Sequence, residues 1–363
     1  MTLRTATAVI DCRALIDNFS VIKKQAPNSQ VLAVLKANAY GHGLERIAKT
    51  LPQADAFGVA RLDEALALRT AGIVKPIVLL EGVFNASELP VLAVNNLQTI
   101  VHNEEQLESI TDPCLSLDKS LKVWLKIDTG MHRLGIAPQD FQRYFQALTQ
   151  SNNVHNDIVL MSHFSCADDV QNNTTLNQIA LFERTVQGLD HARSLANSAA
   201  VNSWPQSHYE WIRPGLMLYG VSPMSCVESN AESLGLKPVM TLQSSLIAVR
   251  KIEPGCAVGY GGAWLSDKKT TIGVVAIGYG DGYPRHAVNG TPVLVNGRKV
   301  PLIGRVSMDM ITVDLGEHST EKVGDLVTLW GDGLAVEEVA EYATTIPYEL
   351  LCNITRRVQV QVK

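Results

Sequence analysis

Short apolar runs alternate with segments of helical periodicity through the first two thirds of the chain, and this alternation restricts the fold more than any other feature. Two clear helical segments, Leu44 to Leu51 and Phe141 to Leu148, carry apolar residues at i, i+3, i+4 and i+7. The runs predicted to be strands are Val31–Leu35, Phe57–Ala60, Ile77–Leu80, Gln98–Val101, Val123–Ile127, Ile158–Ser162, Arg193–Ala196 and Ile212–Leu218. Eight strands, most of them followed by a helix, predict a (β/α)8 TIM barrel.

The pattern changes near Ser222–Pro238, after which closely spaced alternating runs are separated by Gly, Pro and Asn turns. The runs predicted to be strands are Leu242–Val249, Thr271–Ile277, Pro292–Val295, Ile311–Val313 and Leu326–Leu329. Asn296-Gly297 is a strong hairpin signal, Val336–Tyr342 is expected to be a helix, and Val358–Val362 a terminal strand. This part is predicted to be a mainly antiparallel β domain.

The length of 363 residues favours two domains. We expect a cofactor-binding barrel at residues 1–230 and the C-terminal β domain at residues 231–363. Residues 1–10 are expected to pair with the β domain.

Composition excludes several classes of protein. The formal charge of −5 is small for this length and argues against binding to nucleic acid or to a membrane surface. The N-terminus lacks a basic start followed by an apolar stretch, and the six cysteines form no CxxC pair. The histidines include no HExxH motif, so no metal site is expected. Together these features predict a cytoplasmic protein with reduced thiols.

Lys36 is the most informative single residue. It follows the apolar run Val31–Leu35 and precedes the loop Tyr40-Gly41-His42-Gly43. A lysine at the C-terminal mouth of a barrel strand points to where barrel enzymes do their chemistry, and its neutral amine can form an imine with a carbonyl cofactor. From the residues alone, a solvated lysine at a strand end is the commoner explanation.

The segment around Lys36 resembles the cofactor-lysine motif of bacterial alanine racemases, and the resemblance continues in order along essentially the whole chain. The matching stretches are Val31–Gly43, Leu125–Gly135, Ser162–Phe164, Asn197–Ala200, Arg213–Leu216 with Tyr219-Gly220, Gly259–Gly261, Ile277–Gly282 and Gly304–Asp309. The resemblance implies a pyridoxal 5′-phosphate enzyme that interconverts L-alanine and D-alanine, either for peptidoglycan or for alanine catabolism.

The resemblance implies two bases on opposite faces of the substrate Cα. Lys36 would hold the cofactor as an imine and act as one base, and Tyr260 would be the other. Because a free tyrosine has a pKa near 10, the phenolate needs stabilisation, which the family supplies through a histidine that corresponds to His163. Read alone, Tyr260 is a turn tyrosine between glycines and His163 a strand-end histidine.

The resemblance places three cationic residues at the cofactor ring. Arg213 would face the pyridine nitrogen and, because arginine donates but does not accept a proton, would leave that nitrogen unprotonated and disfavour a long-lived carbanion. Most pyridoxal enzymes place a carboxylate there. Arg133 would contact the phenolic oxygen and approach the substrate carboxylate. Lys126 corresponds to a lysine that several relatives carry as a carbamate, whose negative charge would orient Arg133.

Four residues correspond to the family's phosphate cradle, namely Tyr40, Ser198, Gly215 and Leu216. In the β domain, Met308 and Asp309 correspond to a segment near the substrate carboxylate, and Tyr279 to a tyrosine that narrows the entrance. The resemblance implies a homodimer in which the β domain of one subunit completes the barrel site of the other.

The sequence departs from relatives at two positions. Arg356 stands where some members have a tyrosine that reaches the phosphate, which puts that contact in doubt. His132 stands where many have glycine.

Three other functions remain open. A pyridoxal-dependent decarboxylase of the same fold is disfavoured by Arg213, and a pyridoxal-phosphate carrier without activity by the second domain and Tyr260. A racemase of broader specificity, acting on serine for example, often carries an export signal, which is absent here.

Overall fold

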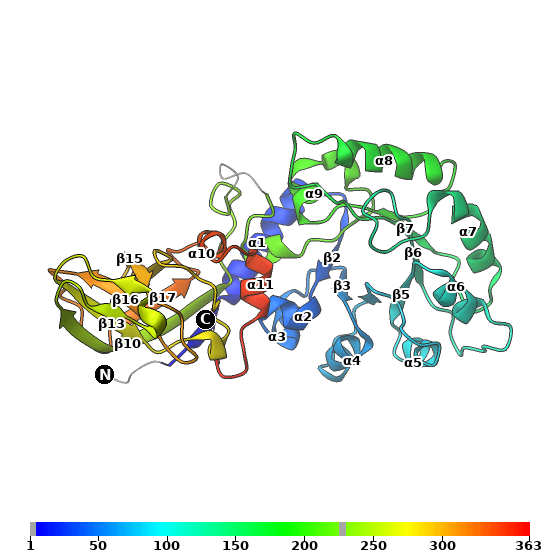
Figure 1. The fold of residues 1–363 in the computed structure, drawn as a ribbon. Helices are drawn as coiled ribbons and strands as arrows, with labels where there is room; N and C mark the ends of the chain where they lie inside the picture. Colours follow the sequence, from blue (N-terminus) through cyan, green and yellow to red (C-terminus); the bar gives the residue numbers. More distant parts are fainter. Residues whose placement is uncertain (1–4, 225–229) are drawn as a thin grey trace.

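The computed structural model describes residues 5–224 and 230–363, and its N-terminal part contains the predicted parallel barrel (Figure 1). Its strands are β2 (Gln30–Val34), β3 (Ala56–Val59), β4 (Ile77–Leu79), β5 (Gln98–Val101), β6 (Val123–Lys126), β7 (Val159–Met161), β8 (Arg193–Ser194) and β9 (Trp211–Ile212). They pair in the order β8-β7-β6-β5-β4-β3-β2-β9. The ring closes between β8 and β9, where the backbone N–H of Arg213 donates to the carbonyl of Ala196 at 2.8 Å.

Helices follow the strands and cover the outside of the barrel (Figure 1). They are α1 (Cys12–Gln25), α3 (Leu44–Thr50), α4 (Leu62–Thr70), α5 (Glu88–Val94), α6 (Glu104–Thr111), α7 (Phe141–Gln150), α8 (Thr174–Thr185) and α9 (Ser198–Ser203). Both helices predicted from i, i+3, i+4, i+7 spacing are confirmed as α3 and α7. In α7 the predicted apolar face is the buried one, with Phe141, Tyr144 and Leu148 in the core.

The last two barrel strands are shorter than predicted. The run Ile212–Leu218 is extended only as far as Ile212, because Pro214 has no N–H to donate to a ladder and Leu216–Tyr219 forms a 3-10 turn. The run Arg193–Ala196 ends at Ser194, because Asn197 caps α9 by accepting a hydrogen bond from Ala200 N at 3.0 Å. Both strands therefore end in turns that bring backbone and hydroxyl groups to the barrel mouth.

The C-terminal part forms the second sheet, in which most pairs are antiparallel. Its strands are β10 (Met240–Ile252), β13 (Thr270–Val275), β14 (Pro292–Val295), β15 (Arg298–Ile303), β16 (Ile311–Gly316), β17 (Leu326–Trp330) and β18 (Gln359–Val362), with β11 (Ala257–Val258) and β12 (Trp264–Leu265) forming a separate ribbon. The N-terminal strand β1 (Thr7–Ile10) lies between β10 and β18 in this sheet. The predicted hairpin is confirmed: Asn296 and Gly297, both with positive φ, join β14 to β15.

Two late helices differ in how well the sequence indicated them. The helix α10 (Val336–Tyr342) has the predicted bounds, whereas α11 (Pro347–Cys352) was not expected. The helix α11 lies against the barrel segment Lys36–Tyr40, labelled α2 in Figure 1. A continuous core of buried apolar residues extends through both parts of the chain.

Candidate active site

A cavity of about 570 Å³ opens at the C-terminal ends of the barrel strands. It is lined by nine residues predicted from sequence: Lys36, Tyr40, Lys126, Arg133, His163, Ser198, Arg213, Gly215 and Leu216. These residues lie at or after the ends of five different strands, so only the closed barrel places them side by side.

Lys36 begins an unusual turn. The next four residues, Ala37 to Tyr40, all have φ between 51° and 55°, a left-handed conformation that costs roughly 1–2 kcal/mol for each residue other than glycine. Glu64 of α4 holds the start of the turn, because its Oε1 accepts a hydrogen bond from Ala37 N at 2.7 Å. The turn directs both Lys36 and Tyr40 toward the cavity.

His42 supports this turn from beneath. Its Nδ1 lies 2.8 Å from the carbonyl of Tyr40 and 3.1 Å from that of Ala39, so Nδ1 carries the proton and donates to both. The ring also contacts Tyr219, which stacks against Tyr40. Burial lowers the pKa of His42 to about 4, and the histidine is therefore neutral.

Three cationic residues surround Lys126. Burial first, and then the charges of Arg213, Arg133 and Lys36, lower the pKa of Lys126 to about 7. A substantial fraction of the Lys126 side chain is consequently an uncharged amine at neutral pH, which makes it a nucleophile.

Arg213 is buried and tied to the barrel from several sides. Its guanidinium donates to Ser194 Oγ at 2.6 Å, to the Ser162 carbonyl at 2.6 Å and to the Leu195 carbonyl at 3.2 Å. Burial lowers the pKa of Arg213 to about 10, so it stays charged at neutral pH. The hydrogen bonds fix this charge at the wall of the cavity.

Arg213 also determines the tautomer of His163. Its Nη2 lies 3.3 Å from His163 Nδ1, and since a guanidinium only donates, Nδ1 accepts and the ring proton is on Nε2. Burial and the positive charges of Arg213, Lys126, Arg133 and Lys36 hold the pKa of His163 well below its usual value. His163 is a neutral hydrogen-bond donor at the cavity wall.

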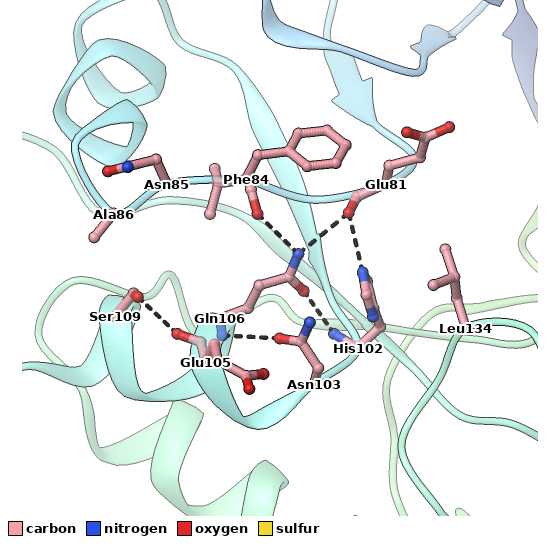
Figure 2. Close-up of a pocket in the computed structure, with 11 residues that line it drawn as sticks. Glu81, Phe84, Asn85, Ala86, His102, Asn103, Glu105, Gln106, Ser109 and Leu134 are labelled. Atoms are coloured by element: carbon pink, nitrogen blue, oxygen red, sulfur yellow. Dashed lines mark hydrogen bonds between the residues drawn. The ribbon is translucent and has the colours of Figure 1, made fainter.

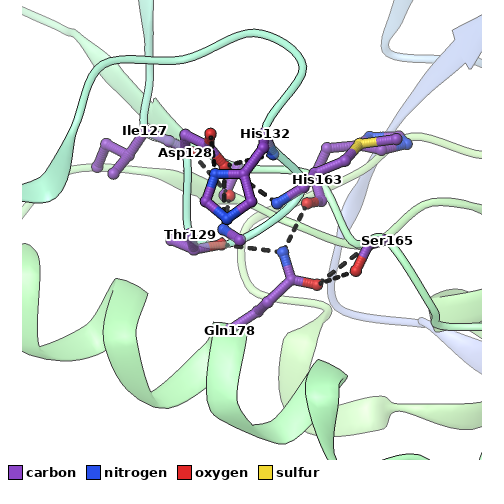
Figure 3. A network of polar contacts seen from close by, with 10 residues as sticks. Ile127, Asp128, Thr129, His132, His163, Ser165 and Gln178 are labelled. Atoms are coloured by element: carbon purple, nitrogen blue, oxygen red, sulfur yellow. Dashed lines mark hydrogen bonds and ion pairs between the residues drawn. The ribbon is translucent and has the colours of Figure 1, made fainter.

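A buried glutamine connects the loops that carry His163 and Arg133 (Figure 3). Gln178 Nε2 donates to the His163 carbonyl at 3.0 Å and to Thr129 Oγ1 at 3.3 Å. Asp128 accepts hydrogen bonds from the backbone of Gly130, Met131 and His132 and so fixes the turn before Arg133. His132 has φ of 55°, a conformation that favours glycine, and its ring pairs with Asp128 at 3.2 Å.

At one end of the cavity, two side-chain hydroxyls lie close to the backbone of Gly215. Ser198 Oγ accepts hydrogen bonds from Gly215 N at 2.9 Å and Met217 N at 3.3 Å. A Cβ added at Gly215 would lie 2.5 Å from the hydroxyl of Tyr40, so any other residue would displace the Tyr40 side chain. The hydroxyls of Ser198 and Tyr40 therefore lie beside the backbone of Gly215 at this end of the cavity.

Sequence reasoning missed the contribution of α11. Ile346, Tyr348 and Cys352 line the cavity, and the ring of Tyr348 lies 5.7 Å from that of Tyr40. Tyr348 thus brings a tyrosine hydroxyl to the cavity, whereas Arg356, which stands where some relatives have a tyrosine, does not line it. Pro347 at the first helical position was the available signal.

A neighbouring cavity of about 380 Å³ lies between the loop that precedes α5 and the helix α6, and it shares Glu81 and Leu134 with the first (Figure 2). Its main polar groups are already committed. Gln106 Nε2 donates to the carbonyls of Glu81 and Val83, and His102 Nε2 donates to that of Glu81. They hold the loop that forms one wall of the larger cavity.

The predicted residues of the β domain lie elsewhere. Tyr260, Tyr279 and Met308 are 71%, 40% and 53% exposed, and none of them lines the cavity around Lys36. Their loops nevertheless lie together, because Tyr279 N donates to the Ser307 carbonyl and Gly280 N to the Met308 carbonyl, while Gly259 packs against Arg305. The fold gathers them on one surface of the β domain.

In residues 5–224 and 230–363, no group of three or more His, Cys, Asp or Glu residues could hold a metal ion. No helix in residues 5–224 or 230–363 has the length and apolarity to cross a membrane.

The chain is similar to alanine racemases over nearly its whole length. The sequence model of the alanine racemase N-terminal domain matches residues 10–223, and that of the C-terminal domain matches residues 239–362. Alanine racemases from Photobacterium profundum and Vibrio cholerae are 55% and 54% identical over 358 residues, which is 99% of this chain and 99% and 98% of theirs.

Solved structures give the same result. The fold is similar to the crystal structure of biosynthetic alanine racemase from Pseudomonas aeruginosa, with a TM-score of 0.95 and 44% identity over 99% of this chain and 100% of that one. It is also similar to alanine racemase from Bartonella henselae with covalently bound pyridoxal phosphate, with a TM-score of 0.90 and 30% identity over 99% of each chain. The chain belongs to the alanine racemase family.

Proposed function

We propose that this protein interconverts L-alanine and D-alanine with pyridoxal 5′-phosphate bound at Lys36. The observation that carries the proposal is the convergence of Lys36, Arg213 and the Tyr40–Ser198–Gly215 group in one cavity of an alanine racemase fold. When bound, the cofactor withdraws electrons from the substrate Cα–H bond and makes that proton removable.

The cavity residues fit a phosphorylated pyridine. Backbone at Gly215 with the hydroxyls of Ser198 and Tyr40 would hold the phosphate, and the position of Leu216 in the same turn adds backbone to this group. Tyr348 of α11 is a further hydroxyl for this end. Arg213 would donate to the ring nitrogen and leave it without a proton, which favours rapid proton return over side reactions.

Two bases would exchange the Cα proton on opposite faces. Lys36 is the base on the face of its own barrel, and we assign the other to Tyr260 of a second subunit. The high exposure of Tyr260 and its absence from the lining of the cavity in its own chain support this assignment. His163, a neutral donor bonded to Arg213, would stabilise the phenolate.

The protein would therefore act as a homodimer. The barrel of residues 1–230 would hold the cofactor, and the β domain of residues 231–363 would complete the site of its partner. Arg133 would bind the substrate carboxylate, with Met308, Asp309 and Tyr279 of the partner narrowing the site. We place this activity in the cytoplasm, in supply of D-alanine for peptidoglycan or in alanine catabolism.

We further propose that Lys126 is carbamylated. Its pKa of about 7 provides the neutral amine, whose nitrogen would bond to the carbon of carbon dioxide while one N–H proton is lost to solvent. The product is an anion among the three cations that disfavour the ammonium. The carbamate would orient Arg133 toward the substrate.

One experiment tests reaction type and substrate range together. The cofactor-loaded protein is incubated with each L-amino acid in deuterated water, and the products are separated on a chiral column. We expect deuterium at Cα and formation of the D-enantiomer with alanine first. Equal turnover of serine would indicate a broader racemase, and release of carbon dioxide without racemisation would contradict the proposal.

A further inference from the structure

Arg357 reaches carboxylates on two separate loops of the β domain. Its Nη2 donates to Asp309 Oδ1 at 2.7 Å, and its Nε lies 3.3 Å from Asp281 Oδ1. Asp309 belongs to the loop that carries Met308, and Asp281 ends the turn that begins at Tyr279. One guanidinium thus joins the two loops whose side chains we assign to the partner's site.

The Asp281 end of this contact is rigid. Asp281 is only 5% exposed, and its second oxygen, Oδ2, accepts a hydrogen bond from Gly278 N at 3.0 Å. Thr355, two residues before Arg357, donates from Oγ1 to the Gly280 carbonyl at 2.9 Å and from its N–H to the Asp281 carbonyl at 3.2 Å. The backbone before Arg357 and the side chain of Arg357 therefore hold the same turn.

The two loops also contact each other directly. A Cβ added at Gly278 would lie 2.3 Å from the Ser307 carbonyl oxygen and 2.4 Å from that of Met308. Such close backbone contact leaves the loops little freedom to slide independently, and Arg357 closes the unit from outside. The directions of Tyr279 and Met308 are then set together.

We propose that Arg357 is a positioning residue that holds the Tyr279 and Met308–Asp309 loops in the arrangement needed by the partner subunit's site. This inference rests on the proposed function with its shared sites. It also assigns Asp309 a different role: an unpaired carboxylate near the substrate carboxylate would repel it, and pairing with Arg357 offsets that charge. Asp309 then acts through Arg357 and not as a direct substrate ligand.

The segment that leads from α11 to Arg357 also contacts the barrel of its own chain. Arg357 could therefore affect the active site of its own chain by a second route. A Cβ on Gly41, in the turn after Lys36, would lie 2.1 Å from the Leu351 carbonyl oxygen, and one on Gly282 would lie 2.2 Å from that of Asn353. Arg357 could therefore act in cis on the cofactor turn through α11, or in trans through the loops. The two routes predict different behaviour in mixed dimers.

Single variants give the first measurement. We expect Arg357→Gln to lower kcat/KM for alanine about tenfold, mainly through KM, with unchanged cofactor content, because a small loss of loop alignment weakens the closed site. Arg357→Lys should recover part of the loss. The matched control is Arg356→Gln, which removes the same charge from a neighbour that makes no ion pair among the described residues. This control should behave as wild type.

A mixed dimer separates the two routes. One subunit carries Arg357→Gln and the other Lys36→Ala, with different affinity tags so that the mixed species is purified. Its only barrel with Lys36 belongs to the Arg357→Gln subunit, and the loops completing that barrel come from the subunit with native Arg357. Action in trans predicts the wild-type KM, measured against a mixed dimer of wild type and Lys36→Ala.

Each outcome decides the proposal. A raised KM in the mixed dimer, equal to that of the Arg357→Gln homodimer, would place the effect in cis and overturn it. A wild-type KM in the Arg357→Gln homodimer would also overturn it, and would leave racemase activity and shared sites untouched. The control dimer of wild type and Lys36→Ala could also fail to racemise alanine although the wild-type homodimer does. In that case the two active sites of a dimer do not work independently, and both the proposed shared sites and the inference about Arg357 are contradicted.

Discussion

The barrel cavity and the outer loops of the β domain each carry part of the proposed active site, but the residues are buried in the first region and exposed in the second. In the cavity, Arg213 and Lys126 are buried, and several hydrogen bonds from one chain fix the Arg213 guanidinium. On the β domain, Tyr260 and Met308 project from loops and are mostly exposed. One chain thus encloses the residues that we propose to hold the cofactor, whereas the tyrosine that we propose as the second base is exposed at its surface.

This difference has a physical origin. Charged side chains in an enclosed, low-dielectric cavity are costly unless they have fixed hydrogen-bond partners. A cavity that holds several cations must therefore supply such partners from its own chain. A tyrosine that completes a neighbour's site must instead remain accessible until the subunits associate. Variants in the two regions should therefore differ in kind, and the following experiments compare them in order of decreasing effect.

The largest effect is expected for Lys36→Ala. It removes both the proposed covalent anchor of the cofactor and one of the two proposed bases, so racemisation should fall by at least about a thousandfold. Borohydride treatment of the wild-type protein should fix the cofactor on Lys36, identified by peptide mass spectrometry. Labelling of another lysine would contradict the assignment of the cavity.

The second largest effect is expected for Tyr260→Phe, in the other region. Loss of the proposed second base should lower kcat about 10²- to 10⁴-fold while the cofactor stays bound. The residual Cα proton exchange, followed by NMR in deuterated water, should be biased toward the opposite enantiomer from that of Lys36→Ala. The same bias in both variants would rule out two bases on opposite faces.

A smaller effect is expected where α11 meets the cofactor turn. Gly41→Ala adds both backbone strain at φ +80° and a collision with the Leu351 carbonyl oxygen. We expect it to lower the free energy of unfolding by about 2–4 kcal/mol and to weaken cofactor retention. The control Gly72→Ala has similar strain at φ +86° with nothing within 4 Å, and should cost only about 1 kcal/mol. Equal losses would mean that α11 does not brace the turn.

The smallest effect is the pH dependence of stability from Lys126. Its folded pKa of about 7 lies below its usual value of 10.5, so the folded state releases this proton first. Below about pH 7 Lys126 is protonated in both the folded and the unfolded state, so the folded state bears the full cost of the buried charge. As the pH rises above about 7, the folded state loses this proton and the protein becomes more stable. Between about pH 7 and 8 this group should add about 1 kcal/mol of stability. Urea denaturation in buffer free of carbon dioxide should show this slope in the wild type and lose it in Lys126→Met.

Much of the fold and half of the site could be predicted. Alternation of apolar runs and helical segments is a local property, and it indicated the barrel, the change to a β domain and the hairpin at Asn296-Gly297. Lys36, Ser198 and Arg213 were predicted as site residues because they stand in or just after predicted strands, within motifs shared with alanine racemases. Local patterns failed at Pro214 and Asn197, where a missing N–H and a helix cap end strands earlier than their apolar runs.

The sequence by itself determined which residue types stand at the ends of the barrel strands, because strand and helix periodicity depend on neighbours in the chain. Only the tertiary structure decided that Lys126 lies among three cations, that Tyr348 reaches the cavity from α11, and that Arg357 joins two loops of the β domain. These features join segments far apart in the chain, and a pKa or an ion pair depends on distances that only the folded chain sets. For the same reason, the exposure of Tyr260, on which the proposed dimer depends, could not be read from its motif.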